Sequence, residues 1–210
     1  MEHAKRITLL TLFFVAIIAV VAFFILKPHK DLGPKVVIPT ATLPTIGDSK
    51  AKNQIVAFED LKCANCAIYN KLLFPQIKRE LIDSGKAKYS IILLAFIPGS
   101  PPAANAAYCL YQQNPDYFFP FVEYVYQHQP DENTNWATVT QLMQFASAAA
   151  PKADQKRLSL CLIDGNNDAT ITNNLAIARS VMGQEVTTPA LFVNGHKVNS
   201  LTMDGIKNLL

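Results

Sequence analysis

Two cysteines separated by two residues are the part of this sequence best suited to redox chemistry. The dipeptide Ala64-Asn65 lies between Cys63 and Cys66. The apolar run 55–58 precedes the pair and an amphipathic stretch follows it, which predicts a strand, a dithiol and a helix. Unpaired N–H groups and the dipole at a helix N-terminus favour a thiolate. The order therefore suits thiol–disulfide exchange, although a lone CxxC pair also occurs in zinc sites.

A second pattern lies far downstream. Thr188-Pro189 precedes the apolar, strand-like run 190–193, and Asn194-Gly195 follows that run. Asn-Gly is a strong signal for a two-residue turn between strands. We therefore expect a hairpin that pairs 190–193 with 197–199.

These motifs together resemble the thioredoxin superfamily, in its DsbA-like branch of exported bacterial thiol–disulfide oxidoreductases. The matching stretches are Ile46-Gly47-Asp48, the run 58–66 and the run 188–195, and the resemblance covers roughly residues 45–210. It implies an α/β, thioredoxin-like fold with a helical insertion domain. It also implies an enzyme that forms or rearranges disulfides in exported proteins and needs no cofactor and no metal ion.

The resemblance assigns roles to the dithiol motif. Cys63 is expected to be the nucleophile, and Cys66, one turn into the helix and less exposed, to resolve the mixed disulfide. Ala64 and Asn65 are expected to tune the redox potential. Strongly oxidising relatives have a histidine at the position of Asn65, so we expect the thiolate here to be stabilised less than theirs.

The downstream motif is expected to face the dithiol. In the family the peptide bond before this proline is cis, so Pro189 should be cis. The backbone of the preceding residue, here Thr188, then pairs with the substrate chain like an added strand. A threonine at this place resembles the isomerase-type relatives more than the strongest oxidases.

The charged residues around the dithiol depart from the family pattern. Thioredoxin-like proteins often bury a carboxylate six residues before the nucleophile, where this chain has Ala57. Glu59 shares a strand face with Ala57 and offers a substitute that acts through a water. The interpretation we favour places Glu59 and Asp60 on the surface at the strand end. Lys62 either adds positive potential beside Cys63 or is a solvated surface lysine.

Two further cysteines lie far from the dithiol in sequence. Four cysteines permit three pairings, and pairing of the dithiol leaves Cys109 and Cys161. We expect them to form a structural disulfide in an oxidising compartment. The alternative is two separate buried cysteines that act as small apolar residues.

The N-terminus carries an apolar segment of the length that crosses a membrane. Residues 7–26 contain no charge, and about 20 apolar residues span a bilayer as a helix. We expect residues 1–6 to be a flank, 7–26 an uncleaved transmembrane signal anchor and 27–44 a proline-rich stalk. A cleaved signal peptide is the alternative. The exported domain would then lie in the periplasm or outside, on a single-pass protein of the bacterial inner membrane.

The remaining chain suits one domain with an insertion. We expect a thioredoxin-like core at 45–98 and 187–210 and a helical insertion at 99–186. The core should contain strands at 55–58 and 89–97. The insertion should contain helices at 103–113, 117–128, 136–149, 154–163 and 169–182, and a last helix should cover 203–210.

The charge distribution narrows the class of partner. The net charge is +3, and its excess of Lys and Arg lies in residues 1–35, next to the apolar segment. This pattern favours anionic lipid headgroups and argues against nucleic acid.

The expected partners are reduced or unfolded exported proteins and a membrane redox partner. That partner is a quinone-linked oxidase if the enzyme is an oxidase, and a membrane reductant if it is an isomerase or reductase. The alternative function is a copper- or zinc-carrying thioredoxin-like protein, which would use both sulfurs of the dithiol.

Overall fold

The computed structural model describes residues 10, 12–18 and 32–210. Within these residues no helix has the length and apolar character needed to cross a bilayer. The predicted anchor 7–26 falls mostly outside the described residues, and so does the start of the predicted stalk, up to residue 31.

The chain divides into two units, Met1–Leu32 and Gly33–Leu210, and the second holds the fold. The second unit includes residues that the sequence assigns to the stalk. Val36 N–H donates to the carbonyl of Gly195 at 2.9 Å, and the side chains of Val36 and Leu43 pack against the sheet. Apolar side chains that precede the predicted domain start at residue 45 are therefore partly buried against the domain.

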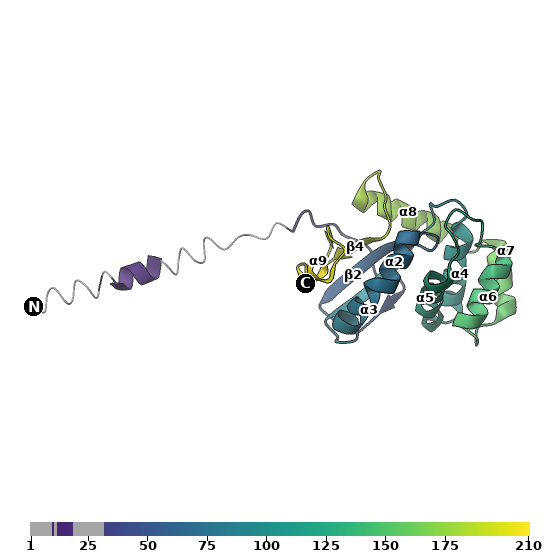
Figure 1. Ribbon diagram of the computed structural model, residues 1–210, viewed down its shortest axis with the longest axis horizontal. Helices are drawn as coiled ribbons and strands as arrows, with labels where there is room; N and C mark the ends of the chain where they lie inside the picture. Colours follow the sequence, from purple (N-terminus) through teal and green to yellow (C-terminus); the bar gives the residue numbers. More distant parts are fainter. Residues whose placement is uncertain (1–9, 11, 19–31) are drawn as a thin grey trace, which may run out of the picture. The chain divides into compact units, whose positions relative to one another are not determined.

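A mixed sheet forms the centre of this unit (Figure 1). In spatial order its strands are β1 (Thr45–Ile46), β3 (Ala87–Leu94), β2 (Asn53–Asp60), β4 (Ala190–Val193) and β5 (His196–Lys197). β2 and β3 run parallel, with Ile55 opposite Tyr89, and the other pairs are antiparallel. The two central strands, β2 and β3, are almost entirely buried because both faces of the sheet are covered. The predicted hairpin turn is present, with positive φ at Asn194 and Gly195.

The helices after the dithiol cover one face of the sheet, together with α9 (Met203–Lys207), whose Ile206 joins the same core. α2 (Ala64–Leu72) and α3 (Phe74–Ile77) follow each other, and a π-helical turn at Lys78–Ile82 completes them. The break falls just before Pro75, which lacks an N–H for the preceding turn.

The second face of the sheet is covered by α8 (Asp168–Met182). Ile177 and Ala178 pack against the sheet residues Phe58 and Phe192. The Asn174 side chain donates to the carbonyl of Leu93 on β3 at 2.9 Å. The sequence includes this helix in the insertion 99–186, and its apolar face packs on the sheet. Asn167 precedes the helix, and Asp168 is its first residue.

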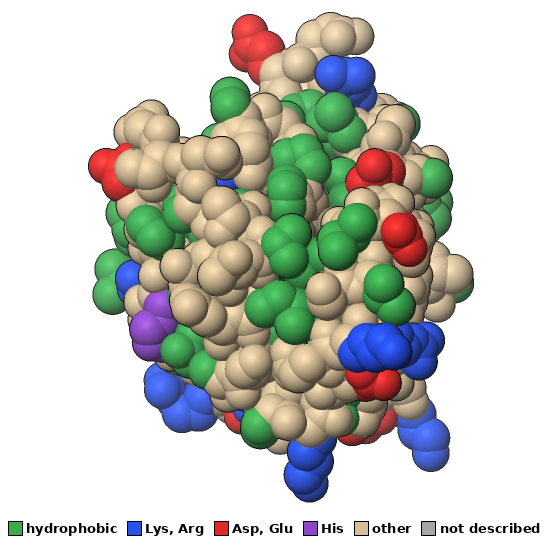
Figure 2. Space-filling model, turned by 90° about the vertical axis from the view of Figure 1, so that its right-hand side faces the viewer, with side chains coloured by type: hydrophobic (Ala, Val, Ile, Leu, Met, Phe, Trp, Pro, Cys, Tyr) green, Lys and Arg blue, Asp and Glu red, His purple; other side chains and the backbone are tan. Residues whose placement is uncertain are grey.

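The insertion itself is a group of four helices beside the sheet, as far as the described residues show (Figure 1). They are α4 (Pro101–Gln113), α5 (Phe118–His128), α6 (Val139–Ala149) and α7 (Gln155–Asp164), with a 3₁₀ turn at Pro115–Tyr117 before α5. α6 begins later than predicted, because Thr138 caps it by accepting from Gln141 N–H. Figure 2 looks onto this side of the molecule and shows apolar side chains (green) exposed among polar ones. Leu160 and Ile163 of α7 are exposed apolar residues.

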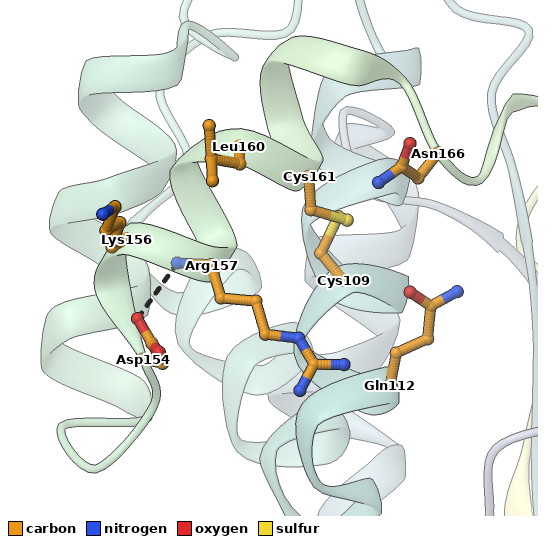
Figure 3. A pocket seen from close by; sticks show the side chains of 8 residues that line it. All are labelled: Cys109, Gln112, Asp154, Lys156, Arg157, Leu160, Cys161 and Asn166. Atoms are coloured by element: carbon orange, nitrogen blue, oxygen red, sulfur yellow. Dashed lines mark hydrogen bonds between the residues drawn. A yellow bond between two sulfur atoms is a disulfide. The ribbon is translucent and has the colours of Figure 1, made fainter.

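Cys109 of α4 and Cys161 of α7 form a disulfide. It borders a cavity of about 390 Å³ (Figure 3), lined by Cys109, Gln112, Asp154, Lys156, Arg157, Leu160, Cys161 and Asn166. Asp154 caps α7 by accepting from Arg157 N–H at 3.0 Å, and the Arg157 side chain reaches toward α4. The bridge thus joins two helices through cysteines that are 52 residues apart in sequence.

We expect the double variant Cys109→Ala/Cys161→Ala to unfold at a lower urea concentration than the wild type. The loop-entropy model gives a loss of about 3–4 kcal/mol in the free energy of unfolding, because the bridge restricts a long loop in the unfolded chain. Recovery of both cysteines as free thiols from the oxidised wild type, by non-reducing peptide mapping, would contradict the pairing.

Candidate active site

The turn that carries the dithiol is organised by the buried carboxylate of Asp60. One oxygen accepts from Lys62 N–H at 2.9 Å. The other accepts from the N–H groups of Phe96 and Ile97, both at 3.1 Å, and from the hydroxyl of Ser100 at 3.0 Å. Asp60 is fully buried, so its assignment to the surface is wrong. These hydrogen bonds connect the end of β2 to the segment after β3.

Cys63 is the N-cap residue of α2, immediately before its first residue. Its sulfur accepts from Cys66 N–H at 3.3 Å, as an N-cap side chain does. Cys63 is 6% exposed and Cys66 is 0% exposed, and both are free thiols. Cys63 is thus more enclosed than expected, while Ala64 and Asn65 between the sulfurs are exposed.

The two sulfurs differ in acidity. A hydrogen bond from the Cys66 side chain is the main cause that lowers the pKa of Cys63 to about 6, and burial opposes it. The side chain of Thr188 and the N–H groups of Cys66 and Asn65 lower this pKa further. Burial raises the pKa of Cys66 well above its ordinary value, and the charge on Glu59 adds to this. At neutral pH the first sulfur is therefore a thiolate and the second a thiol.

A second buried carboxylate, Glu59, lies beneath the dithiol. It is 0% exposed, so its assignment to the surface is also wrong. One oxygen accepts from the hydroxyl of Tyr89 at 2.9 Å, and that hydroxyl is 3.0 Å from the hydroxyl of Tyr69. Among the residues that the structure describes, the other oxygen has no hydrogen-bond partner. Burial raises the pKa of Glu59 to about 7, against the effect of the hydroxyls of Tyr126 and Tyr89.

The downstream motif lies against the dithiol. The peptide bond between Thr188 and Pro189 is cis, and the carbonyl oxygen of Thr188 is 3.5 Å from the sulfur of Cys63. A groove of about 450 Å³ runs beside this contact. It is lined by Asn65, Ile68, Tyr69, Leu72, Leu73, Thr188, Pro189 and Leu201. Ile68 and Leu72 are largely exposed there, so the groove offers apolar contacts to an extended chain.

Lys62 takes neither of the positions that the sequence suggests. It is 2% exposed, and its ammonium donates to the carbonyls of Pro98 at 2.8 Å and Thr134 at 2.9 Å. It therefore joins the dithiol turn to the loop between α5 and α6. That loop also brings Glu132 to the dithiol, where its carboxylate accepts from Ala64 N–H at 2.8 Å. Sequence analysis missed Glu132, because no local pattern marks an exposed loop as a neighbour of the dithiol.

The structure thus brings together the dithiol 63–66 and the loop 188–189. Cys109 and Cys161 are not among the residues around the dithiol. They form the disulfide between α4 and α7 of the insertion. Within the described ranges, no group of three or more His, Cys, Asp or Glu side chains is placed to hold a metal ion.

Comparison with known sequences relates this site to proteins that form disulfides. The sequence model of the family described as "Thioredoxin" matches residues 40–210. The probable disulfide bond formation protein D of Bacillus cereus is 27% identical over 203 residues, which cover 95% of this chain and 93% of that protein. The disulfide bond formation protein D of Bacillus subtilis is 35% identical over 96 residues, which cover 45% of this chain and 43% of that protein.

Solved structures give the same relation. The crystal structure of Chlamydia trachomatis DsbA matches with a TM-score of 0.73 and 27% identity, and covers 83% of this chain and 92% of that one. Oxidised BdbD from Bacillus subtilis matches with a TM-score of 0.73 and 28% identity, and covers 79% of this chain and 89% of that one. The described unit and these proteins therefore share the sheet and the helical insertion.

The buried Glu59 should make the stability of the reduced protein depend on pH. Between pH 4.5 and about 7 the unfolded chain ionises this carboxyl while the folded protein keeps the proton, since the folded pKa is about 7. The free energy of unfolding is thus highest below this window and falls as pH rises through it. In the wild type the free energy of unfolding should fall by about 3 kcal/mol between pH 4 and pH 8 because of Glu59. We expect this fall to be absent in Glu59→Gln, as measured by urea unfolding.

Glu123→Gln on the exposed face of α5 is the matched control and should keep the wild-type pH dependence. An identical pH dependence in the wild type and Glu59→Gln would show that Glu59 titrates normally in the folded protein.

Proposed function

The chain belongs to the thioredoxin family, and on that basis we propose that it is a DsbA-like thiol:disulfide oxidoreductase of exported proteins. The observation that carries the proposal is the contrast between the two sulfurs of one CxxC motif. The hydrogen bond from Cys66 lowers the pKa of Cys63 to about 6, and burial raises the pKa of Cys66. One sulfur is thus prepared to attack or leave as a thiolate, and the other to hold a proton.

The exchange proceeds through a mixed disulfide. In the oxidising direction a substrate thiolate attacks Cys63 in the Cys63–Cys66 disulfide, the S–S bond breaks, and Cys66 leaves and takes a proton. A second substrate thiolate then attacks the substrate sulfur of the mixed disulfide, and Cys63 leaves as a thiolate. Two electrons pass from the substrate to the protein, which ends as the dithiol. The reverse steps reduce a substrate disulfide.

Two groups around the dithiol support these steps. The carbonyl oxygen of Thr188 lies 3.5 Å from the Cys63 sulfur. A backbone N–H of the substrate can donate to this carbonyl while the substrate sulfur reacts with Cys63. Glu59, whose pKa burial raises to about 7, exchanges a proton near neutral pH. Its charge is among the causes that raise the pKa of Cys66. We assign to Glu59 the proton that Cys66 takes up and releases.

The cellular setting of the proposal comes from the sequence and the relatives. A relative is named a probable disulfide bond formation protein, and disulfides form and persist in oxidising compartments outside the cytoplasm. We propose that residues 7–26 anchor this chain in the bacterial inner membrane with the enzyme domain outside. Its substrates are then reduced or unfolded exported proteins. A membrane redox partner, either a quinone-linked oxidase or a membrane reductant, restores the dithiol to its working state.

We expect Cys63→Ser to abolish disulfide exchange with a model peptide, and Cys66→Ser to accumulate a mixed disulfide with it. The reason is that only Cys63 is a thiolate at neutral pH, and only Cys66 can release the bound substrate. Mass spectrometry of the protein after incubation with an oxidised peptide measures the adduct. The double variant should form none, and adduct formation on Cys66 in Cys63→Ser would reverse the assignment.

We expect Asn65→His to make the protein more oxidising. An imidazolium beside the sulfur stabilises the thiolate, so the pKa of Cys63 should fall by about one unit. The equilibrium constant for reduction of the protein by glutathione should then increase about tenfold, which corresponds to a rise of about 30 mV in the reduction potential. Thiolate absorbance against pH and equilibration with glutathione measure the two quantities. Asn65→Leu is the uncharged control, and equal values in both variants would show that residue 65 does not act on the sulfur.

A further inference from the structure

The loop between α5 and α6 reaches the dithiol, although it belongs to neither of the two motifs that the sequence marks at 58–66 and 188–195. The carboxylate of Glu132 accepts from Ala64 N–H at 2.8 Å. Ala64 is the first residue of α2, and Cys63 is the residue before it. A carboxylate from the helical insertion is therefore bound to the same helix end that stabilises the nucleophilic sulfur.

The N–H groups at this helix end are divided between two anions. Cys66 N–H donates to the Cys63 sulfur at 3.3 Å, and the N–H of Asn65 also stabilises that thiolate. Ala64 N–H donates to Glu132 instead. The first N–H groups of a helix and its dipole form one limited source of positive potential. A second negative charge placed there weakens the advantage of the thiolate.

The position of Glu132 is held by the loop and by the dithiol turn. Within the loop, Asp131 accepts from Asn133 N–H at 2.8 Å, and its carbonyl accepts from Thr134 N–H at 3.0 Å. Between loop and turn, the Lys62 ammonium donates to the carbonyl of Thr134 at 2.9 Å. The carboxylate is thus delivered by a closed turn that is fastened on the buried Lys62, and not by a freely moving side chain.

The other charged groups at this end have different positions. Lys62 is buried and directed to carbonyl oxygens. Glu59 lies beneath the dithiol in the core. Lys71 and Asp131 line the same shallow groove as Glu132, but no hydrogen bond joins either of them to the start of α2. Among the described residues, the Glu132 carboxylate is the charged side chain bonded to the first N–H of this helix.

We propose that Glu132 is a positioning residue that competes with the Cys63 sulfur for the amino-terminal N–H groups of α2 and so makes the dithiol less oxidising. The inference rests on the proposed function, and it places part of the control of redox potential in the helical insertion. The effect follows from charge balance. Glu132 disfavours the anionic thiolate of the reduced protein, whereas the sulfur in the disulfide is neutral and unaffected.

The test compares Glu132→Gln with the wild type. The amide oxygen of glutamine can still accept from Ala64 N–H, so the variant removes the charge and keeps the contact. We expect the pKa of Cys63 to fall by about half a unit. The equilibrium constant with glutathione should shift about threefold toward the reduced protein. This corresponds to a rise of about 14 mV in the reduction potential. Both are measured on the full chain, by thiolate absorbance against pH and by redox titration.

Two further variants separate the charge from other effects. Asp131→Asn removes a neighbouring charge that is not bonded to α2, and its amide oxygen can still accept from Asn133 N–H as Asp131 does, so the turn is kept and both quantities should be unchanged. Glu132→Ala should shift both in the direction of Glu132→Gln. If Glu132→Ala does not fold, Glu132→Gln alone decides, because its contact with the helix is retained.

Three outcomes would overturn the inference. They are an unchanged potential and pKa in Glu132→Gln, an equal shift in Asp131→Asn, or a shift toward a weaker oxidant. These results are distinct from failure of the proposed function. A wild-type protein that shows no dithiol exchange contradicts that function, whereas an active wild type with an unaltered Glu132→Gln variant contradicts only the role of Glu132.

Discussion

The buried carboxylate of Asp60 fixes the geometry on which the dithiol depends. Its two oxygens accept four hydrogen bonds, from the turn at Lys62 and from the segment 96–100 after β3. A buried carboxylate is costly unless it is fully hydrogen-bonded. Any rearrangement of the turn would leave it unsatisfied, so the start of α2 has one favourable position. The sulfur of Cys63 is thereby held at the N-terminus of the helix.

From this fixed turn, the two sulfurs enter different environments. Cys63 meets the N–H groups of α2 and the loop at Thr188, whereas Cys66 lies in the core above Glu59. The difference in acidity follows from their positions, because Cys63 caps the N-terminus of α2, whereas Cys66 lies within the helix and is fully buried. Tyr69 and Tyr89 complete the polar part of this core by a chain of hydroxyls that ends on Glu59.

The helical insertion contributes to the site as well as to the size of the domain. Its loop between α5 and α6 supplies the acceptor for the buried Lys62 ammonium and the carboxylate on Ala64 N–H. The disulfide between α4 and α7 ties two helices of the same insertion. The insertion is thus stabilised internally, and it reaches the region of the dithiol through this loop and through Tyr126 of α5, whose hydroxyl donates to the carbonyl of Asp60.

The sequence by itself determined the local order of the chain around the chemistry. The apolar run before Cys63, the helical spacing after it and the Asn194-Gly195 turn depend on neighbouring residues, and they appear in the structure where they were predicted. The helices of the insertion also followed from local periodicity, with ends shifted by a few residues. These features are local because turn chemistry, capping and amphipathic periodicity act over a few residues.

Only the tertiary structure decided which charged residues are buried and what they contact. Glu59 and Asp60 look like surface carboxylates at the end of a strand, but the helices and the segment after β3 cover them. α8 reads as part of the insertion, yet it packs on the sheet. Glu132 is 68 residues from Ala64 in sequence. Such contacts arise from how distant segments pack together, and no local pattern of residue types carries that information.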